Sequence, residues 1–453
     1  MSSRPVTVAF ISLGCAKNLV DSQTMASALL SNGLDLAGSP EDADAIVINT
    51  CAFINDARNE STKAILSACS LKSKGACRAV IVAGCMPQRY KNDMFKMMPG
   101  IDAIIGLDEL RDLPAVIRQV IDGGKHVTRL SEVSRALFEP GDKPVIFSTG
   151  AFAYIKIAEG CNHPCAFCAI PSIRGKYRSR KPDDIIKEAE YLLDKGFREL
   201  NLISQDVSSY GQDLTDKADL AGLITKLGRI GGKFWIRILY AYPGKITDEL
   251  INAIGETEQA CHYFDVPVQH SDPDILKAML RAGTCNHVLD LPQRIRSRIP
   301  DAALRTSIIT GFPGETSARF KHLAEFVQAS EFDQLGVFTF SPENGTAAEK
   351  LPNRPSAAMA EKRKKEIMRI QKKIVDQKHR SLLSTNCEVL LERYIKEANN
   401  VWIARSSRLA PEVDGVIFVS GVPASKKPGD FVTIEYNDTA GYDMLAEWNE
   451  YKV

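Results

Sequence analysis

The chain has 453 residues, of which 44% are hydrophobic and 25% charged, and its formal net charge is +1. This composition is typical of a globular protein of several domains, and the balanced charge excludes a general electrostatic attraction to nucleic acid or membranes. No stretch approaches the roughly 18 uninterrupted apolar residues of a membrane helix, and the N-terminal segment lacks a secretory signal pattern. We therefore expect a cytoplasmic protein without a membrane partner, whose 11 cysteines bind metal, take part in catalysis or are buried, rather than form disulfides.

Residues 5–120 alternate short β-branched runs with helical stretches. The runs VTVAFISL, ADAIVINT and RAVIVAG are typical of buried strands in an open parallel α/β sheet. Cys15, Cys51 and Cys85 each follow the end of one run. Because the carboxyl ends of parallel strands share one edge of a sheet, we expect these three thiols to converge there. The alternative is three small hydrophobic residues that happen to lie at strand ends.

The region from about residue 147 to 376 repeats a strand–helix alternation six times. The six strand segments are AYIKIAE, ELNLISQ, FWIRILYAYP, YFDVPVQ, ALRTSIITGF and QLGVFTFSP. Serial βα units with right-handed crossovers predict a parallel barrel, and six units rather than eight predict an incomplete one.

A basic helical stretch over residues 358–380 ends this region, and it is either a nucleic-acid contact or a solvated connecting helix. Residues 380–446 then change to short strands separated by turns, which predicts a small antiparallel β-barrel. Residues 381–453 carry seven basic and eleven acidic side chains, a net charge of −4. A domain that grips RNA should be basic, so this charge favours a basic partner, unless it only keeps the domain soluble.

Cys161, Cys165 and Cys168 lie within eight positions, directly after the first strand of the predicted barrel. This is the face on which barrel folds build active sites, and the spacing lets one loop wrap around a cluster. A tetrahedral zinc site would need a fourth ligand, and His163, inside the loop, is awkwardly placed to supply it. The other cysteines lack such a placement, and we expect ordinary buried or partly exposed thiols at Cys69, Cys77, Cys261, Cys285 and Cys387.

The spacing Cys-x-x-x-Cys-x-x-Cys, with the aromatic Phe167 before the last cysteine, resembles the signature of radical S-adenosylmethionine (SAM) enzymes. The resemblance implies that the three thiolates hold three irons of a [4Fe–4S] cluster and that the fourth iron is open to SAM. In that superfamily an electron from the cluster cleaves SAM to a 5′-deoxyadenosyl radical, which is chemistry that side chains cannot supply.

Nearly the whole chain resembles the radical-SAM methylthiotransferase family. The two cysteine triplets, the extended signature GCNHPCAFCAIPSIRGKYRSR, the segment ITGFPGET and a C-terminal segment that looks like a TRAM domain carry this resemblance. It implies a cluster-binding domain over 5–120, a radical SAM barrel over 147–376 and a TRAM domain over 380–446. It also implies two [4Fe–4S] clusters and SAM as cofactors, the N-terminal cluster carrying the sulfur that is transferred.

Two segments, SLGCAKNLVDSQ and FTFSPENGTAA, resemble the RimO-type branch of the family, although Ala16 replaces a proline that is common there. That branch modifies the β-carbon of an aspartate in small-subunit ribosomal protein twelve, whose C–H bond is not acidic enough for removal by a base. The resemblance implies this protein as partner, free or in the ribosomal subunit, together with an electron donor, a sulfur source and at most a secondary RNA contact. The alternatives are a tRNA adenosine methylthiotransferase of the MiaB type and a non-enzymatic iron–sulfur electron carrier, which would not need so large a barrel.

Five further residues are candidates for cofactor binding. Gln205, Asp206 and Gln269 follow predicted barrel strands, so they are expected to face the barrel mouth and contact SAM or substrate, or else to hydrogen-bond within their loops. Gly311 and Gly314, in the segment GFPGE, either let the backbone approach SAM or form a simple turn.

Overall fold

The computed structural model describes residues 4–75, 77–137, 145–148, 150–281, 285–396 and 400–449, with the side chains of residues 285–287 left out. The chain divides into two compact units. The first unit comprises Met1–Phe147, Ala158–Arg180 and Glu343–Thr346, and the second comprises Ser148–Ile157, Lys181–Pro342 and Ala347–Val453. Among the described residues, no helix is both long enough and apolar enough to cross a membrane.

The first unit is built on a six-stranded sheet in the order β2-β1-β3-β4-β5-β6, with every neighbouring pair parallel. This confirms the open parallel sheet that the apolar runs predict. Both central strands, β3 and β4, are buried along their whole length, which is why they consist mainly of alanine, valine and isoleucine. The strands are β1 (Thr7–Ser12), β2 (Asp35–Leu36), β3 (Ala45–Thr50), β4 (Ala79–Gly84), β5 (Ala103–Ile105) and β6 (Val127–Arg129).

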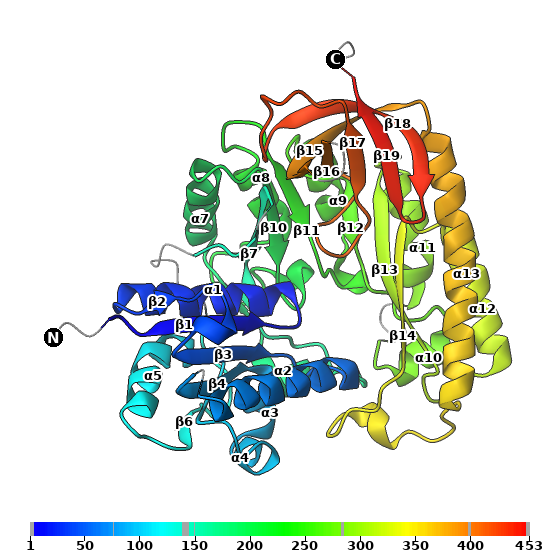
Figure 1. Cartoon of the computed structure of the whole chain (residues 1–453). Coiled ribbons are helices and arrows are strands. Elements are labelled where there is room, and N and C mark those ends of the chain that lie inside the picture. The colour runs from blue at the N-terminus through cyan, green and yellow to red at the C-terminus, as the bar shows by residue number, and fades with distance from the viewer. Residues whose placement is uncertain are drawn as a thin grey trace. The chain divides into compact units, whose positions relative to one another are not determined.

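Helices cover both faces of this sheet (Figure 1). Successive strand side chains point to opposite faces, so Ile46 and Ile48 enter one apolar core while Ala45 and Val47 enter the other. On the Ala45 face lie α1 (Ala16–Ser31) and α5 (Leu113–Ile121). On the Ile46 face lie α2 (Asn55–Ser73), α3 (Cys85–Tyr90) and α4 (Asp93–Met97). Two 3₁₀ turns complete the unit, η1 (Pro40–Asp42) and η2 (Leu110–Asp112).

The loop that carries the second cysteine triplet packs within the first unit. Its ends are joined by an antiparallel pair of short strands, β8 (Ala158–Glu159) and β9 (Arg178–Ser179). Its helix α6 (Ile170–Arg174) inserts Ile173, which is 1% exposed, into the core on the Ile46 face of the sheet. Both cysteine triplets therefore belong to one compact unit, although they are far apart in sequence.

The second unit contains the six parallel strands of an incomplete barrel, as predicted. They form two three-stranded sheets, in the orders β11-β10-β7 and β12-β13-β14, and an isolated parallel bridge joins Ile236 of β11 to Ala260, shortly before β12. The strands are β7 (Phe152–Lys156), β10 (Glu199–Ile203), β11 (Trp235–Ile238), β12 (Tyr263–Asp265), β13 (Ala303–Thr310) and β14 (Gln334–Thr339). The helices are α7 (Pro182–Asp194), α8 (Leu220–Leu227), α9 (Asp248–Glu256), α10 (Pro273–Ala278), α11 (Cys285–Arg296) and α12 (Ser317–Ser330), with 3₁₀ turns η3 (Val207–Ser209), η4 (Pro243–Lys245) and η6 (Ala347–Lys350).

A long helix, α13 (Ala357–Leu382), contacts β14 and leads to a closed five-stranded barrel (Figure 1). The barrel strands are β15 (Asn386–Ile395), β16 (Val401–Ser406), β17 (Ile417–Ser420), β18 (Phe431–Ala440) and β19 (Asp443–Trp448). Their order is β15-β16-β17-β19-β18, and the neighbours are antiparallel except β17 and β19, which run parallel where the barrel closes. Closure leaves no free strand edge.

Buried ion pairs join the C-terminal barrel to the six-stranded barrel. Glu199, on β10, accepts hydrogen bonds from Arg237 Nε at 2.6 Å and from Arg405 Nη2, on β16, at 2.5 Å. Asp414 accepts from Tyr263 Oη at 2.6 Å and pairs with Arg305 Nε at 3.2 Å. These contacts fix one barrel against the other within the second unit.

Candidate active site

Cys15, Cys51 and Cys85 lie at the carboxyl ends of the adjacent strands β1, β3 and β4. Cys15 caps the start of α1, and Cys85 is the first residue of α3. The charges of Cys15 and Cys51, if ionised, raise the pKa of Cys85, so the three thiols are within electrostatic range of one another. The structure thus brings together the three cysteines that the strand pattern predicts to converge.

Glycines before two of these cysteines make the turns possible. Gly14 and Gly84 have φ angles of 94° and 91°, which only glycine adopts at low cost. A Cβ on Gly14 would lie 2.8 Å from the Cβ of Cys51, and a Cβ on Gly84 would lie 2.2 Å from Asn49 Oδ1. Each strand can therefore turn sharply toward its helix and leave the cysteine at the shared edge of the sheet.

The site offers positive charge to its thiols. Burial raises the pKa of Cys85 to about 12, against the opposing effect of the Arg174 guanidinium. Burial also raises the pKa of Cys51. At Cys15 burial acts in the same direction, but the charges of Lys17 and Arg174 and hydrogen bonds from the backbone amides of Asn18 and Lys17 together outweigh it, so the pKa of the thiol lies below its usual value. Deprotonated sulfur, which is the form that binds iron, is thus opposed by burial and favoured by these two cations.

Arg174 reaches from the second cysteine loop to the first triplet. Its Nη1 donates to both carboxylate oxygens of Glu159 at 3.0 Å. Its Nη2 lies 2.7 Å from Asn18 Oδ1, 2.9 Å from Asp21 Oδ2 and 3.6 Å from Cys85 Sγ. The residue is 2% exposed, so these contacts are shielded from water.

Asn18 holds the loop ends around the first triplet in place. Its Nδ2 donates to the carbonyl oxygens of Leu13 and Thr50, both at 2.9 Å. Thr50 immediately precedes Cys51. One buried amide therefore ties the carboxyl ends of β1 and β3 together while its oxygen accepts from Arg174.

In the second loop, backbone amides point at two of the three sulfurs. The amide of His163 donates to Cys161 Sγ, and the amide of Ile170 donates to Cys168 Sγ, each at 3.4 Å. The amide of Cys168 donates to the carbonyl oxygen of Cys165 at 3.0 Å, which curls the loop between them. The three cysteines are partly exposed. Donors of this kind stabilise thiolates that ligate iron.

Each triplet supplies three cysteine sulfurs, the donors that iron–sulfur clusters use. Across the described residues, no three histidine, cysteine, aspartate or glutamate side chains converge as they would around one metal ion. In a [4Fe–4S] cluster each thiolate binds a different iron, so the sulfurs must surround the cluster rather than meet at one point. Three cysteines on three strand ends and three on one curled loop fit this need.

The polar candidates at the six-stranded barrel differ in what they contact. Asp206 Oδ1 accepts from the Ser208 amide at 3.0 Å and Oδ2 accepts from Ser209 Oγ at 2.5 Å, so its carboxylate caps the turn η3. Gln205 and Gln269 are partly exposed at the ends of their strands. Gln269 has a φ angle of 71°. The loop alternative therefore accounts for Asp206.

The two glycines of GFPGE have structural reasons for being glycine. Gly311 has a φ angle of 76°, and a Cβ there would lie 2.4 Å from the Cβ of Ala360 on α13. Gly314 has a φ angle of 85°, and its amide donates to the carbonyl oxygen of Asn353 at 2.9 Å. The close approach of α13 accounts for a glycine at 311, and the positive φ angle of the turn accounts for one at 314.

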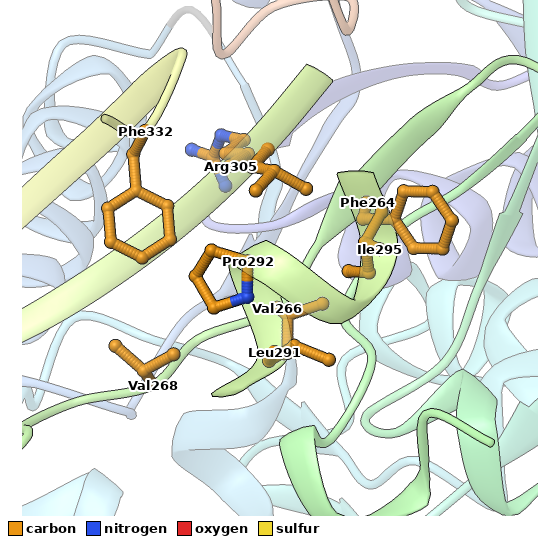
Figure 2. Close-up of a pocket in the computed structure, with 9 residues that line it drawn as sticks. Phe264, Val266, Val268, Leu291, Pro292, Ile295, Arg305 and Phe332 are labelled. Atoms are coloured by element: carbon orange, nitrogen blue, oxygen red, sulfur yellow. The ribbon is translucent and has the colours of Figure 1, made fainter. Parts of the chain in front are cut away.

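Two cavities in the second unit lie away from the predicted site residues. The first, shown in Figure 2, is enclosed by apolar side chains such as Phe264, Leu291 and Phe332, and its volume is about 10 Å³. It holds no more than one water. The second, of about 160 Å³, lies between α13 and the C-terminal barrel and includes Lys378 and Arg408 in its lining. No predicted cofactor or cluster residue lines either cavity.

The remaining cysteines behave as expected where their side chains are described. Cys77 is buried at the amino end of β4, away from the cluster edge, and Cys261 is buried. Cys69 and Cys387 are partly buried thiols. The side chain of Cys285 lies outside the described residues.

Three family models match the chain: the uncharacterized protein family UPF0004 over residues 7–106, the Radical SAM superfamily over 155–327 and the TRAM domain over 385–448. The incomplete barrel with its cysteine loop is thus a radical SAM domain, and the class is that of radical SAM enzymes. Curated relatives named "Ribosomal protein uS12 methylthiotransferase RimO" match over nearly the full length. Those of Syntrophus aciditrophicus, Caldicellulosiruptor saccharolyticus and Clostridioides difficile are 43%, 42% and 41% identical, and cover 98%, 98% and 97% of this chain and 98%, 99% and 98% of theirs. The chain belongs to the RimO family of radical SAM methylthiotransferases.

Solved structures support the fold alone. The radical SAM methyltransferase TsrM from Kitasatospora setae aligns with a TM-score of 0.57 at 12% identity, over 77% of this chain and 74% of that chain. The cobalamin-dependent radical SAM enzyme OxsB aligns with a TM-score of 0.51 at 13% identity, over 82% of this chain and 56% of that chain.

Sequence reasoning missed the polar residues that surround the first triplet. Arg174, Asn18, Asp21 and Glu159 are buried and connected, but they have no periodicity or spacing that marks them. The available signal was their position: Asn18 and Asp21 lie in the segment after Cys15, and Arg174 closes the extended signature around Cys161.

Proposed function

We propose that this chain transfers a methylthio group to the β-carbon of an aspartate in ribosomal protein uS12. The observation that carries the proposal is the presence of two cysteine triplets in one compact unit of a chain whose full-length relatives carry that activity in their name. A tRNA adenosine methylthiotransferase would share the domains, but the relatives described above are named for uS12. An electron carrier would not need the radical SAM barrel or the TRAM domain.

Two clusters are part of the proposal. Cys161, Cys165 and Cys168 would hold one [4Fe–4S] cluster, and the strand-end triplet Cys15, Cys51 and Cys85 would hold the other. Bound there, the cluster on the Cys161 loop would supply the radical from SAM, and the cluster on the strand-end triplet would carry the sulfur. The chain's own part is to present three thiolates to each cluster through the strand ends, the curled loop and the amides that donate to sulfur.

SAM contacts at the carboxyl ends of the barrel strands belong to the proposal as well. Gln205 and Gln269 keep partly exposed side chains and are the stronger candidates. Asp206, whose carboxylate caps η3, would act by shaping that loop. Gly311 would contribute by letting α13 approach the turn between β13 and α12, and Gly314 by allowing the positive φ angle of that turn.

The acidic C-terminal barrel is a weaker argument for a basic partner than its sequence suggests. Glu392 bonds to Arg405, Glu412 bonds to Tyr154 and Asp414 is buried against Arg305. These contacts hold the barrel in place, and the charges of Glu392 and Asp414 are already paired with arginines. We propose uS12 as the protein substrate chiefly from the family, with cytoplasmic location, an electron donor and a sulfur source as the activity requires.

The proposal includes a secondary RNA contact, which we assign to α13. Five cations lie on its exposed face, spread over about 27 Å of helix at 1.5 Å per residue. None of the five forms an ion pair with any residue that the structure describes. They are Lys362, Lys365, Arg369, Lys373 and Arg380. Such a row can neutralise phosphates if uS12 is modified within the ribosomal subunit.

A parallel substrate assay tests the function. The reconstituted enzyme, with SAM, sulfide and a reductant, is offered free uS12, the small ribosomal subunit and tRNA, and products are identified by mass spectrometry. Modified uS12 supports the proposal, and modified tRNA alone contradicts it. Changing Lys365, Arg369 and Lys373 together to glutamine should slow modification of uS12 in the subunit without changing the salt dependence of the reaction with free uS12. If the variant and the parent enzyme modify the subunit at equal rates, the proposed RNA contact is contradicted.

Iron content tests the clusters independently of the substrate. Two clusters correspond to about eight irons per chain, and replacing either triplet with alanine should leave about four. An unchanged iron content after Cys15, Cys51 and Cys85 are all changed to alanine would contradict a cluster on the strand-end triplet.

A further inference from the structure

Arg174 is the residue that physically connects the two cysteine triplets. It lies at the end of α6, six positions after Cys168, and its guanidinium ends beside Cys85. Its other nitrogen holds Glu159, two positions before Cys161. The same planar group therefore contacts the base of one cluster loop and a sulfur of the other triplet.

The surroundings favour a fixed guanidinium. Arg174 has its two nitrogens directed to opposite sides, one to Glu159 and one to Asp21, and the oxygen of Asn18 accepts from it as well. A guanidinium presents its donors in a rigid fork, so these partners fix its plane. With the plane fixed, the 3.6 Å approach of Nη2 to Cys85 Sγ follows from the fold rather than from a free rotation of the side chain.

We propose that Arg174 is a positioning residue for the N-terminal cluster, whose hydrogen bond and positive charge at Cys85 Sγ raise the cluster's reduction potential. This rests on the proposed function, because it requires a cluster on Cys15, Cys51 and Cys85. Hydrogen bonds to cluster sulfurs and nearby positive charge stabilise the reduced, more negative state of an iron–sulfur cluster. Since Arg174 is anchored to Glu159, a displacement of the Cys161 loop would reach the other cluster through this residue.

The test isolates the N-terminal cluster. In protein with Cys161, Cys165 and Cys168 changed to alanine, the remaining cluster is reconstituted and its midpoint potential is measured by a redox titration followed by electron paramagnetic resonance. Arg174→Gln, which removes the charge, should shift the potential to more negative values. Arg174→Lys keeps the charge but lacks the fork, and should give a smaller shift in the same direction.

Arg178 provides a matched control on the same loop. It is also an arginine, but its guanidinium donates to main-chain carbonyl oxygens, those of Ser134, Ala136 and Lys176 and, at 3.3 Å, that of Arg174. Arg178→Gln should leave the midpoint potential of the N-terminal cluster unchanged. A shift as large as that of Arg174→Gln would contradict a specific role for Arg174.

The outcomes separate this inference from the proposed function. If the protein without Cys161, Cys165 and Cys168 binds no iron, the proposed N-terminal cluster is contradicted, and the proposed role of Arg174 is contradicted with it. If that protein binds iron and the folded Arg174 variants keep the parent potential, only the role of Arg174 is overturned. Circular dichroism establishes folding, and should Arg174→Gln not fold, Arg174→Lys decides. Loss of iron from a folded Arg174 variant, with Arg178→Gln still loaded, supports the positioning role.

Discussion

Arg405→Met tests whether the C-terminal barrel is held by a buried ion pair. Arg405 is 1% exposed and Glu199 is fully buried, and methionine fills similar space without charge. The change leaves Glu199 with Arg237 as its remaining guanidinium partner and also removes the contact from Arg405 to Glu392. Removing one partner of a buried pair costs about 3–5 kcal/mol, so we expect a loss of this size in the free energy of unfolding.

An exposed pair between the same two barrels is the matched control. Lys233 contacts Glu388, with side chains 61% and 44% exposed. Exposed ion pairs contribute about 0–1 kcal/mol, so Lys233→Met should cost far less than Arg405→Met. Equal losses for the two variants would refute the argument from burial.

Urea unfolding followed by tryptophan fluorescence is a suitable assay. The chain has three tryptophans, and all of them lie in the second unit: Trp235 on β11, Trp402 on β16 and Trp448 on β19. Trp235 stacks edge-on against Phe431 of the C-terminal barrel, with ring centroids 5.1 Å apart, so its emission should report separation of the two barrels.

The pH dependence gives a second signature. Burial alone would raise the pKa of Glu199, but Arg405 and Arg237 hold the pKa of this carboxyl below its usual value. A lowered pKa in the folded state stabilises the protein above the unfolded pKa of about 4.3, and this stability is lost as the pH falls through the folded value. The difference between wild type and Arg405→Met should therefore be full at pH 7 and shrink below about pH 4.

Three further predictions concern other contacts. Gly84→Ala places a side chain on a residue with a left-handed backbone, which costs about 1–2 kcal/mol, and the new Cβ would also clash with Asn49 Oδ1. An iron assay should therefore show a fall from about eight toward about four irons per chain. Glu343→Gln weakens the carboxylate contacts to Arg58 and Arg89, which should lower the free energy of unfolding by about 1.5–3 kcal/mol and speed amide hydrogen exchange in α3. Unchanged exchange in α3 would contradict this prediction. Burial would raise the pKa of Asp333, but Lys378 and Arg408 hold it low. Asp333 should therefore stabilise the fold above about pH 4, and Asp333→Asn should lower the urea midpoint more at pH 7 than at pH 3.

The first triplet was predictable because its determinants are local. A continuous apolar run marks each buried parallel strand, and the residue after the run lies at the carboxyl edge whatever the order of the strands. Cys15, Cys51 and Cys85 could be grouped on that basis alone. The adjacency of β1, β3 and β4 is a matter of non-local pairing, and only the structure gives it.

Other features depend on distant contacts and could not be read from the sequence. In the C-terminal barrel, the runs CEVLLERYI, GVIFVSG and GDFVTIEYND indicate β15, β17 and β18, but no such run marks β16 and β19, because short strands of a closed barrel are defined by their partners. A count of charges treats Asp414 as a free carboxylate, whereas the fold buries it against Tyr263. Arg174 looks like a surface residue of a loop until its partners, 153 positions away in the case of Asp21, are known.

The first compact unit is assembled from three separate stretches of chain, and the last of them, Glu343–Thr346, follows all six barrel strands in the sequence. During translation, Asp21 emerges long before Arg174, and Arg89 long before Glu343. The contact between Glu343 and Arg89 can therefore form only after the barrel strands have been made. A fragment ending at residue 147 lacks the other two stretches, so it should be a poor substitute for the complete first unit.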